Sequence, residues 1–162
     1  MATSFSELIK IHVKLDELFL LHQHALLHFE FDKAADLLKK YRATLNEHMR
    51  FEEDVLLPIY TSRAVIERSG ETKLFLDEHK KMRDWVQLFS ETIAELAQDP
   101  APENKLLKLL DRESFFLKLC SHHDNREARF LYPGLDAATT NEERARLLTR
   151  RVMGKNYYCS EN

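Results

Sequence analysis

Apolar residues recur along most of the chain at intervals of three and four positions, the spacing of one face of an α-helix. The pattern predicts four long helices, over about residues 5–28, 32–58, 71–98 and 103–132. Ser4, with Glu7 three positions later, is expected to cap the first helix, and Asp32 the second. Pro58 is expected to break or kink the second helix near its end, and Pro133 to end the fourth.

The same spacing assigns an inward face to each of the first three helices. We expect the first to bury Phe5, Leu8, Ile9, His12, Leu15 and Phe19; the second Leu38, Tyr41, Leu45, His48, Glu52 and Val55; and the third Phe75, Leu76, His79, Met82, Val86 and Phe89.

Short connections join the expected helices, the clearest being the loop Asp99-Pro100-Ala101-Pro102. Four long helices with short connections are typical of an all-α, up-down-up-down four-helix bundle. Thr140 is expected to cap a short fifth helix over about residues 141–153. We therefore expect a bundle over residues 1–135, followed by a short helix and a C-terminal tail over 136–162.

The composition agrees with long helices and indicates which partners and which cellular compartment to expect. The chain has 162 residues with only 3 Gly and 4 Pro, and 31% of its residues are charged. Its formal charge of −3 gives no reason to expect a nucleic-acid or membrane partner. With two cysteines (Cys120 and Cys159) outside any disulfide or C-x-x-C pattern and no signal peptide, we expect a cytoplasmic protein.

Four histidines fall at one height of the expected bundle. In an antiparallel hairpin, two residues lie level when they are equidistant from the turn. His12 and His48 are equidistant from position 30, His79 and His123 from 101, and His48 and His79 from 63.5, all within expected connections. Each of the four also lies in the apolar register of its own helix. The coincidence predicts a single polar layer inside the core.

The other histidines do not meet these conditions equally well. His22 shares the face of His12 but lies ten residues away, about 15 Å along the axis, and His28 is at a helix end. The position equidistant from His24 and His48 lies inside the second helix, so these two residues cannot be level across the first turn. His122 is nearly level with His123, and its neighbours resemble a solvated edge, so we prefer His123 while leaving His122 open.

Two carboxylates join the layer. Glu52 follows His48 by four residues, and Glu127 follows His123 by four, so each pair stacks on one helix face. A buried carboxylate without a partner is costly, whereas one bound to a cation is not. Two such glutamates can bridge two cations from opposite sides, and the donor set suits iron, manganese or, less selectively, zinc.

The motifs HMRFEEDVLLP (48–58) and HDNREARFLYP (123–133), with His12 in IKIHVKLDELF and His79 in EHKKM, resemble the hemerythrin-like, HHE cation-binding family over about residues 5–135. The resemblance implies a non-haem di-iron centre with an oxo or hydroxo bridge. It makes His12, His48, His79 and His123 terminal ligands, two to each iron, and Glu52 and Glu127 bridging carboxylates.

The chain departs from the oxygen-carrying members of that family. They have a second histidine one turn after the first in helix 3, where this chain has Arg83, and a final H-x-x-x-x-D. The pattern here resembles the six-ligand members associated with iron sensing, nitric oxide or peroxide chemistry, and iron-centre repair.

Four functions follow as alternatives. The first is a protein that binds or senses O2, NO or the redox or iron state, and the second is an enzyme that decomposes peroxide or reduces NO, with Tyr41 as a candidate acid. Ferritin-like iron oxidation is disfavoured because no histidine has a glutamate three residues before it. The fourth is a structural bundle without metal, whose folding and spectra would be unchanged in His48→Ala and Glu127→Ala.

Further candidates surround the expected site. Asp16, Tyr41, Glu78 and Arg83 are candidate outer partners of the ligands, each with an ordinary surface role as the alternative. Cys120 is expected to be a buried thiol, and a redox role for Cys159 stays open.

Overall fold

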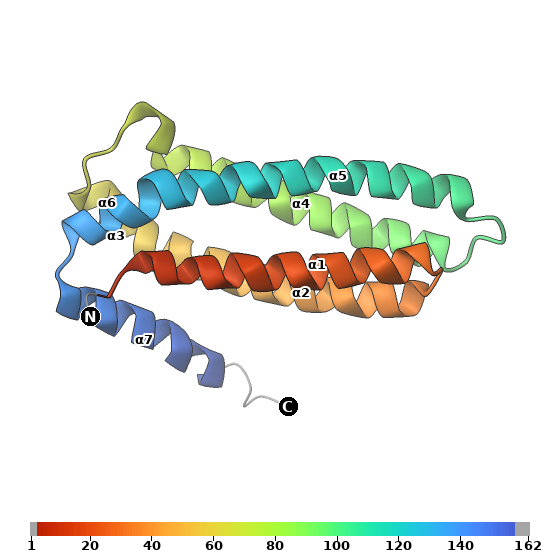
Figure 1. The fold of residues 1–162 in the computed structure, drawn as a ribbon, viewed down its shortest axis with the longest axis horizontal. Helices are drawn as coiled ribbons and strands as arrows, with labels where there is room; N and C mark the ends of the chain where they lie inside the picture. The colour runs from red at the N-terminus through yellow and green to blue at the C-terminus, as the bar shows by residue number, and fades with distance from the viewer. Residues whose placement is uncertain (1–2, 158–162) are drawn as a thin grey trace.

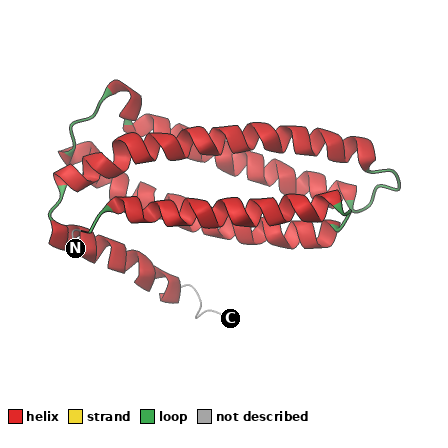
Figure 2. Cartoon of the chain, viewed as in Figure 1, coloured by secondary structure: helices red, strands yellow, loops and turns green. Residues whose placement is uncertain are grey.

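Four long helices lie side by side in the computed structural model, which describes residues 3–157, with side chains as far as position 151 (Figure 1). They are α1 (Ile9–Leu27, preceded by a 3₁₀ turn, Phe5–Leu8), α2 (Phe31–Phe51), α4 (Thr72–Leu96) and α5 (Glu103–Arg126). Helix α1 packs on α2, α2 on α4, α4 on α5 and α5 on α1. All regular elements within residues 3–157 are helical, so the expected all-α class is confirmed (Figure 2).

The inward faces pack into one core. Near its middle, Phe19, Tyr41, Phe89 and Phe116 meet with ring centroids 5.0–6.4 Å apart. Two expected core residues were wrong, because Ile9 is 39% and Leu76 43% exposed. Each follows a fully buried residue, Leu8 or Phe75, and is turned about 100° from it onto the outer side of the helix.

The turn between α1 and α2 is made by local backbone hydrogen bonds. Glu30 N donates to Ala25 O at 2.9 Å and Phe29 N to Leu26 O at 3.0 Å, the pattern that closes a helix C-terminus. Phe29 has φ 58°, a left-handed conformation that usually falls to glycine. The expected cap by Asp32 was wrong: α2 begins one residue earlier, at Phe31, and Asp32 lies in its first turn without a capping bond.

A π-helical turn begins at the glutamate of each H-x-x-x-E motif. Glu52–Leu56 joins α2 to α3 (Leu57–Arg63), and Glu127–Leu131 joins α5 to α6 (Tyr132–Ala138). Each turn directly precedes α3 or α6, whose second residue is a proline that has no N–H for the α-helical ladder. The wider turn lets the helix resume, so the expected end of the fourth helix at Pro133 was wrong.

The remaining elements are a 3₁₀ turn (Arg68–Gly70) and α7 (Asn141–Tyr157). Thr140 caps α7 as expected, since Glu143 N donates to Thr140 Oγ1 and Thr140 N to Glu143 Oε2. Helix α7 runs beyond the expected end near 153, and α6 crosses position 135, while the division at 135 stays a prediction. Among the described helices, none has the length and apolar content needed to cross a membrane.

Candidate metal centre

Six buried side chains meet between the four long helices. His12 comes from α1, His48 from α2, His79 from α4 and His123 from α5, while Glu52 and Glu127 are the first residues of the two π-helical turns. Their exposed fractions run from 0% for both glutamates and His79 to 6% for His12. The structure thus brings together the four histidines selected by the level argument and the two glutamates selected by the i, i+4 spacing, although their role as ligands stays a prediction.

The six residues form two overlapping groups of donor atoms. One comprises Glu52, His79, His123 and Glu127, and the other His12, His48 and Glu127, with the atoms of each group within 4.8 Å of one another. Within each histidine pair the Nε2 atoms converge, at 3.0 Å for His12 and His48 and at 3.2 Å for His79 and His123. Each group can hold a metal ion.

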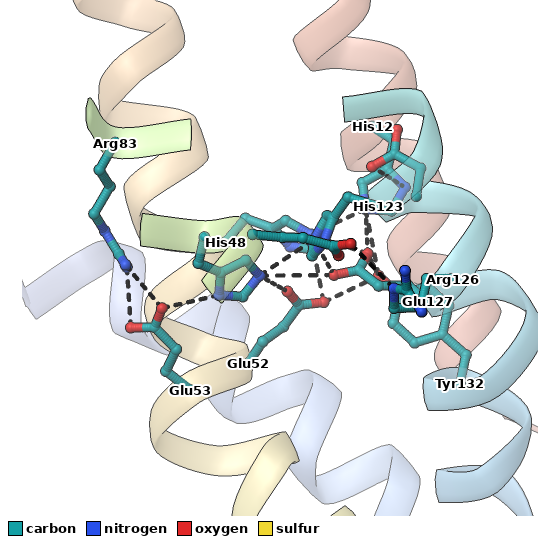
Figure 3. A network of polar contacts seen from close by, with 12 residues as sticks. His12, His48, Glu52, Glu53, Arg83, His123, Arg126, Glu127 and Tyr132 are labelled. Carbon is teal, nitrogen blue, oxygen red and sulfur yellow. Dashed lines mark hydrogen bonds and ion pairs between the residues drawn. The ribbon is translucent and has the colours of Figure 1, made fainter. Parts of the chain in front are cut away.

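Both carboxylates span the two histidine pairs (Figure 3). Glu52 places Oε1 at 3.4 Å from His48 Nε2 and Oε2 at 3.4 Å from His79 Nε2. Glu127 places Oε2 at 3.0 Å from His12 Nε2 and Oε1 at 2.6 Å from His123 Nε2. One oxygen of each carboxylate therefore faces each pair, as a bridge between two cations requires.

Tyr132, the first residue of α6, is part of the centre and was missed in the sequence. Its buried hydroxyl lies 3.0 Å from Glu52 Oε1, 2.8 Å from Glu127 Oε2 and 3.3 Å from His12 Nε2. Burial, followed by the charges of the two glutamates, raises the pKa of Tyr132 well above its ordinary value. The phenol is therefore a proton donor beside the carboxylates.

Two of the histidines are held from behind by an acid and an arginine. His79 Nδ1 donates to Glu53 Oε1 at 2.8 Å, and Arg83 binds both oxygens of Glu53 at 2.9 and 3.0 Å. In the same way, His123 Nδ1 donates to Glu78 Oε2 at 2.8 Å. Such partners fix the tautomer and orientation of a ligating imidazole.

Arg126 completes the second arrangement by donating to Glu78 Oε1 at 3.1 Å. Glu78 and Arg83 had been proposed as outer residues, whereas Glu53 had been missed because it reads as a solvated neighbour of Glu52.

The other two histidines receive no such support from the residues that the structure describes. His12 Nδ1 is 3.6 Å from Asp124 Oδ1, too far for a hydrogen bond, and His48 Nδ1 is buried without a hydrogen-bond partner. Asp16, expected as an outer residue, makes no hydrogen bond to His12 in the described structure. Burial raises the pKa of Asp16, and the charge of His12 opposes this shift only in part. The centre is therefore asymmetric in its surroundings.

The electrostatics of the metal-free centre follow from burial and crowding. Burial, then the charge of Glu127, raises the pKa of Glu52 to about 7. For Glu127 itself, burial favours a higher pKa, but the charge of His123 and the close imidazoles of His12 and His123 outweigh it and hold the pKa well below the ordinary value. Burial lowers the pKa of His48 to about 3, leaving it neutral and able to donate a lone pair.

Two carboxylate oxygens of the centre are left without a hydrogen bond. Glu52 Oε2 and Glu127 Oε1 are buried and accept a hydrogen bond from none of the described residues. Buried polar atoms are nearly always satisfied, and an orphaned carboxylate oxygen is costly. Four imidazole nitrogens that converge on such oxygens fit a pair of divalent cations.

The histidines rejected in the sequence lie elsewhere. His22 is fully buried in a second polar cluster with Glu113, and His24 and His28 are exposed. The side chain of His122 is 66% exposed and contacts Arg126, so the preference for His123 agrees with the placement.

Tyr41 and Cys120 lie beside the centre without touching its carboxylates. The Tyr41 hydroxyl is 3.8 Å from Cys120 Sγ, and both residues line a cavity of about 20 Å³ together with His12, His48 and His123. That volume holds about one water molecule. Cys120 is buried as expected, and Cys159 lies outside the described residues.

Comparisons of the chain with protein-family models, with curated proteins and with solved structures found no match.

Proposed function

We propose that this chain is a non-haem di-iron protein of the hemerythrin-like kind, with its four long helices arranged as an up-down-up-down bundle, and that it binds or senses O2, NO or the redox or iron state. The observation that carries the proposal is the position of the two buried carboxylates, each of which presents one oxygen to each histidine pair. This arrangement would destabilise a purely structural core, because it leaves two buried carboxylate oxygens without a hydrogen bond from the described residues.

The donor set supports iron as the ion. Four imidazoles and two carboxylates suit iron or manganese, with zinc as a less selective substitute. Bound iron supplies electron transfer and open positions for small oxygen- or nitrogen-containing molecules. The cavity beside His12 and His48 is of a size for such a molecule.

An enzyme that decomposes peroxide or reduces NO is the second candidate, and one observation favours it. Either reaction needs protons delivered beside the reacting molecule. The Tyr132 hydroxyl lies within 3.3 Å of atoms of His12, Glu52 and Glu127, where a proton can be delivered. The hydroxyl of Tyr41, the donor expected from the sequence, lies instead 3.8 Å from the thiol of Cys120.

The deciding experiment measures iron content and the optical spectrum of protein purified without added zinc or nickel. We expect about two irons per chain and near-ultraviolet charge-transfer absorption. His79→Ala and Glu127→Ala are expected to lose both. His122→Ala is the matched control, because this neighbour of His123 is exposed. A wild-type protein without iron, or spectra unaffected by the two core variants, would overturn the proposal.

Consumption of peroxide, and of NO with an added electron donor, by the iron-loaded protein then separates the two candidates. An enzyme that draws its proton from Tyr132 would lose turnover in Tyr132→Phe while retaining its iron. A binding or sensing protein would show a ligand-dependent spectrum and no turnover.

A further inference from the structure

The two metal positions of the proposed centre are built unequally. Four buried donor residues lie within 4.8 Å of one another around His79 and His123. Around His12 and His48 the comparable group adds Glu127 alone, although Glu52 Oε1 also lies 3.4 Å from His48 Nε2. The outer nitrogens of His79 and His123 each donate to a carboxylate at 2.8 Å, and an arginine binds that carboxylate in turn. Outer carboxylates of this kind raise metal affinity about 10- to 100-fold.

The described residues provide no comparable support at the other position. His48 is 2% exposed and its Nδ1 has no hydrogen-bond partner, so its ring lacks an outer acceptor. His12 Nδ1 is 3.6 Å from the nearest carboxylate oxygen, on Asp124. An ion between His12 and His48 therefore gains less from its surroundings than one between His79 and His123.

The weaker position also lies under an opening. A surface hollow of about 310 Å³ between α1 and α5 has His12 among its lining residues, with Asp16 and Asp124 beside it. The same three residues line the inner cavity of about 20 Å³, which reaches both His48 and His123. His12, Asp16 and Asp124 thus separate the solvent-filled hollow from the interior. Three further hollows, one beside α3 and α7, one at the connection from α4 to α5 and one on α4, are lined by none of the six residues of the centre.

The chemistry of this opening suits a hydrated divalent cation. Asp16 and Asp124 carry carboxylates, and Ser121 and Asn125 add neutral oxygens to its rim. The inner cavity is also lined by His48, whose Nε2 converges with His12 Nε2 at 3.0 Å. Oxygen donors at the mouth with imidazoles inside give a cation successive partners as it sheds water.

We propose that the ion between His79 and His123 is the permanent one, and that the ion between His12 and His48 exchanges with solvent through the hollow between α1 and α5, past Asp16 and Asp124. The inference rests on the proposed metal centre and adds to it which ion leaves, and by which route.

The test uses Co²⁺, a divalent ion with visible absorption, loaded at two equivalents into metal-free protein. Transfer of Co²⁺ to excess chelator is followed by the loss of that absorption. We expect two phases of one equivalent each, differing at least about tenfold in rate. His12→Ala is expected to abolish the fast phase and leave the slow one.

A variant of the outer support reports on the same asymmetry without removing a ligand. Glu53→Gln is expected to accelerate the slow phase about tenfold, because His79 loses its charged acceptor. Asp54→Asn, the exposed neighbouring residue, is the matched control and leaves both phases unchanged. Circular dichroism establishes that each variant is folded.

The route is tested by uptake. The double variant Asp16→Asn/Asp124→Asn is expected to take up the second Co²⁺ about tenfold more slowly at low salt, with the final stoichiometry still two. Asp111→Asn removes an exposed charge from α5, outside the hollow, and is expected to have no effect. Ser121→Trp, which fills the hollow, is expected to slow both uptake and the fast release.

The outcomes separate the inference from the proposal beneath it. A protein that binds no Co²⁺ overturns the metal centre itself. Two ions released at one rate, or a fast phase that survives His12→Ala, overturn the asymmetry. Uptake that is unaffected by both the charge variant and Ser121→Trp overturns the route.

Discussion

The second buried polar cluster offers a test of the core that does not involve metal. His22 and Glu113 are both 0% exposed, and His22 Nε2 lies 2.8 Å from Glu113 Oε1. The other ring nitrogen of His22 bonds Ala34 O at 2.8 Å, and Gln23 Nε2 donates to Glu113 Oε2 at 3.1 Å. The cluster thus joins α1, α2 and α5 about 15 Å along the axis from His12.

Removing one partner exposes the cost of burying the other. His22→Leu leaves a buried carboxylate with only an amide donor, and we expect it to lower the free energy of unfolding by about 3–5 kcal/mol. Glu113→Leu leaves an imidazole that can be neutral and keep its bond to Ala34, so about 1–3 kcal/mol is expected. For a chain of this size these losses lower the melting temperature by about 2–20 °C.

The double variant His22→Leu/Glu113→Leu is the decisive measurement. With both polar groups replaced by apolar ones, its loss is expected to be smaller than that of His22→Leu alone, because no unpaired group remains. Urea unfolding of metal-free protein, followed by circular dichroism, gives the four free energies. Co²⁺ stoichiometry is the control for an intact centre. A double variant that loses the full sum of the single losses would refute the reasoning.

Four smaller predictions concern single sites and the metal. Phe29→Gly is expected to raise the free energy of unfolding by about 1 kcal/mol, since φ 58° strains any residue with a Cβ; a loss in urea unfolding would contradict this. Gly134→Ala is expected to lower it by about 1–3 kcal/mol in the same assay, because the new methyl would lie 2.7 Å from Tyr60 Cε2, whereas an unchanged midpoint would count against that packing. Burial raises the pKa of the Cys120 thiol to about 12, so in a Cys159→Ser background a thiol reagent at pH 8 is expected to react at least about 100-fold more slowly than with a free thiol. Its rate should rise about tenfold per pH unit below that pKa, and rapid labelling of folded protein would disprove the burial. Chelation of the metal is expected to lower the melting temperature by about 5–10 °C, corresponding to an ion present at about 100 times its Kd, and equal melting of both forms would exclude a stabilising ion.

The height of the polar layer could be predicted because helices have a constant rise. Four helices joined by short connections keep residues level when they are equidistant from the turns, so His12, His48, His79 and His123 could be placed without coordinates. The glutamates followed from the i, i+4 rule, which holds because Glu52 N still donates to His48 O before the π-helical turn begins.

Tyr132 escaped prediction for a physical reason. It lies five positions after Glu127, an offset that an α-helix turns well away from its starting face. The π-helical turn bonds residue i to i+5, and Tyr132 N indeed donates to Glu127 O, so the tyrosine returns to the side of the glutamate. Glu53 and Asp124 were missed because adjacent positions diverge by about 100°, and only neighbouring helices show that they face His79 and His12.

The division of the centre between the two helix hairpins has a consequence for the chain as a whole. The α1–α2 hairpin and its π-helical turn supply His12, His48 and Glu52, and the α4–α5 hairpin with its turn supplies His79, His123 and Glu127. Because each carboxylate faces both histidine pairs, ions at the centre would fasten one hairpin to the other, in the way a disulfide joins distant segments. Such a staple would close a loop across most of the sequence and restrict the unfolded chain. Loss of the ions would then loosen the seam between the hairpins before it loosened either hairpin.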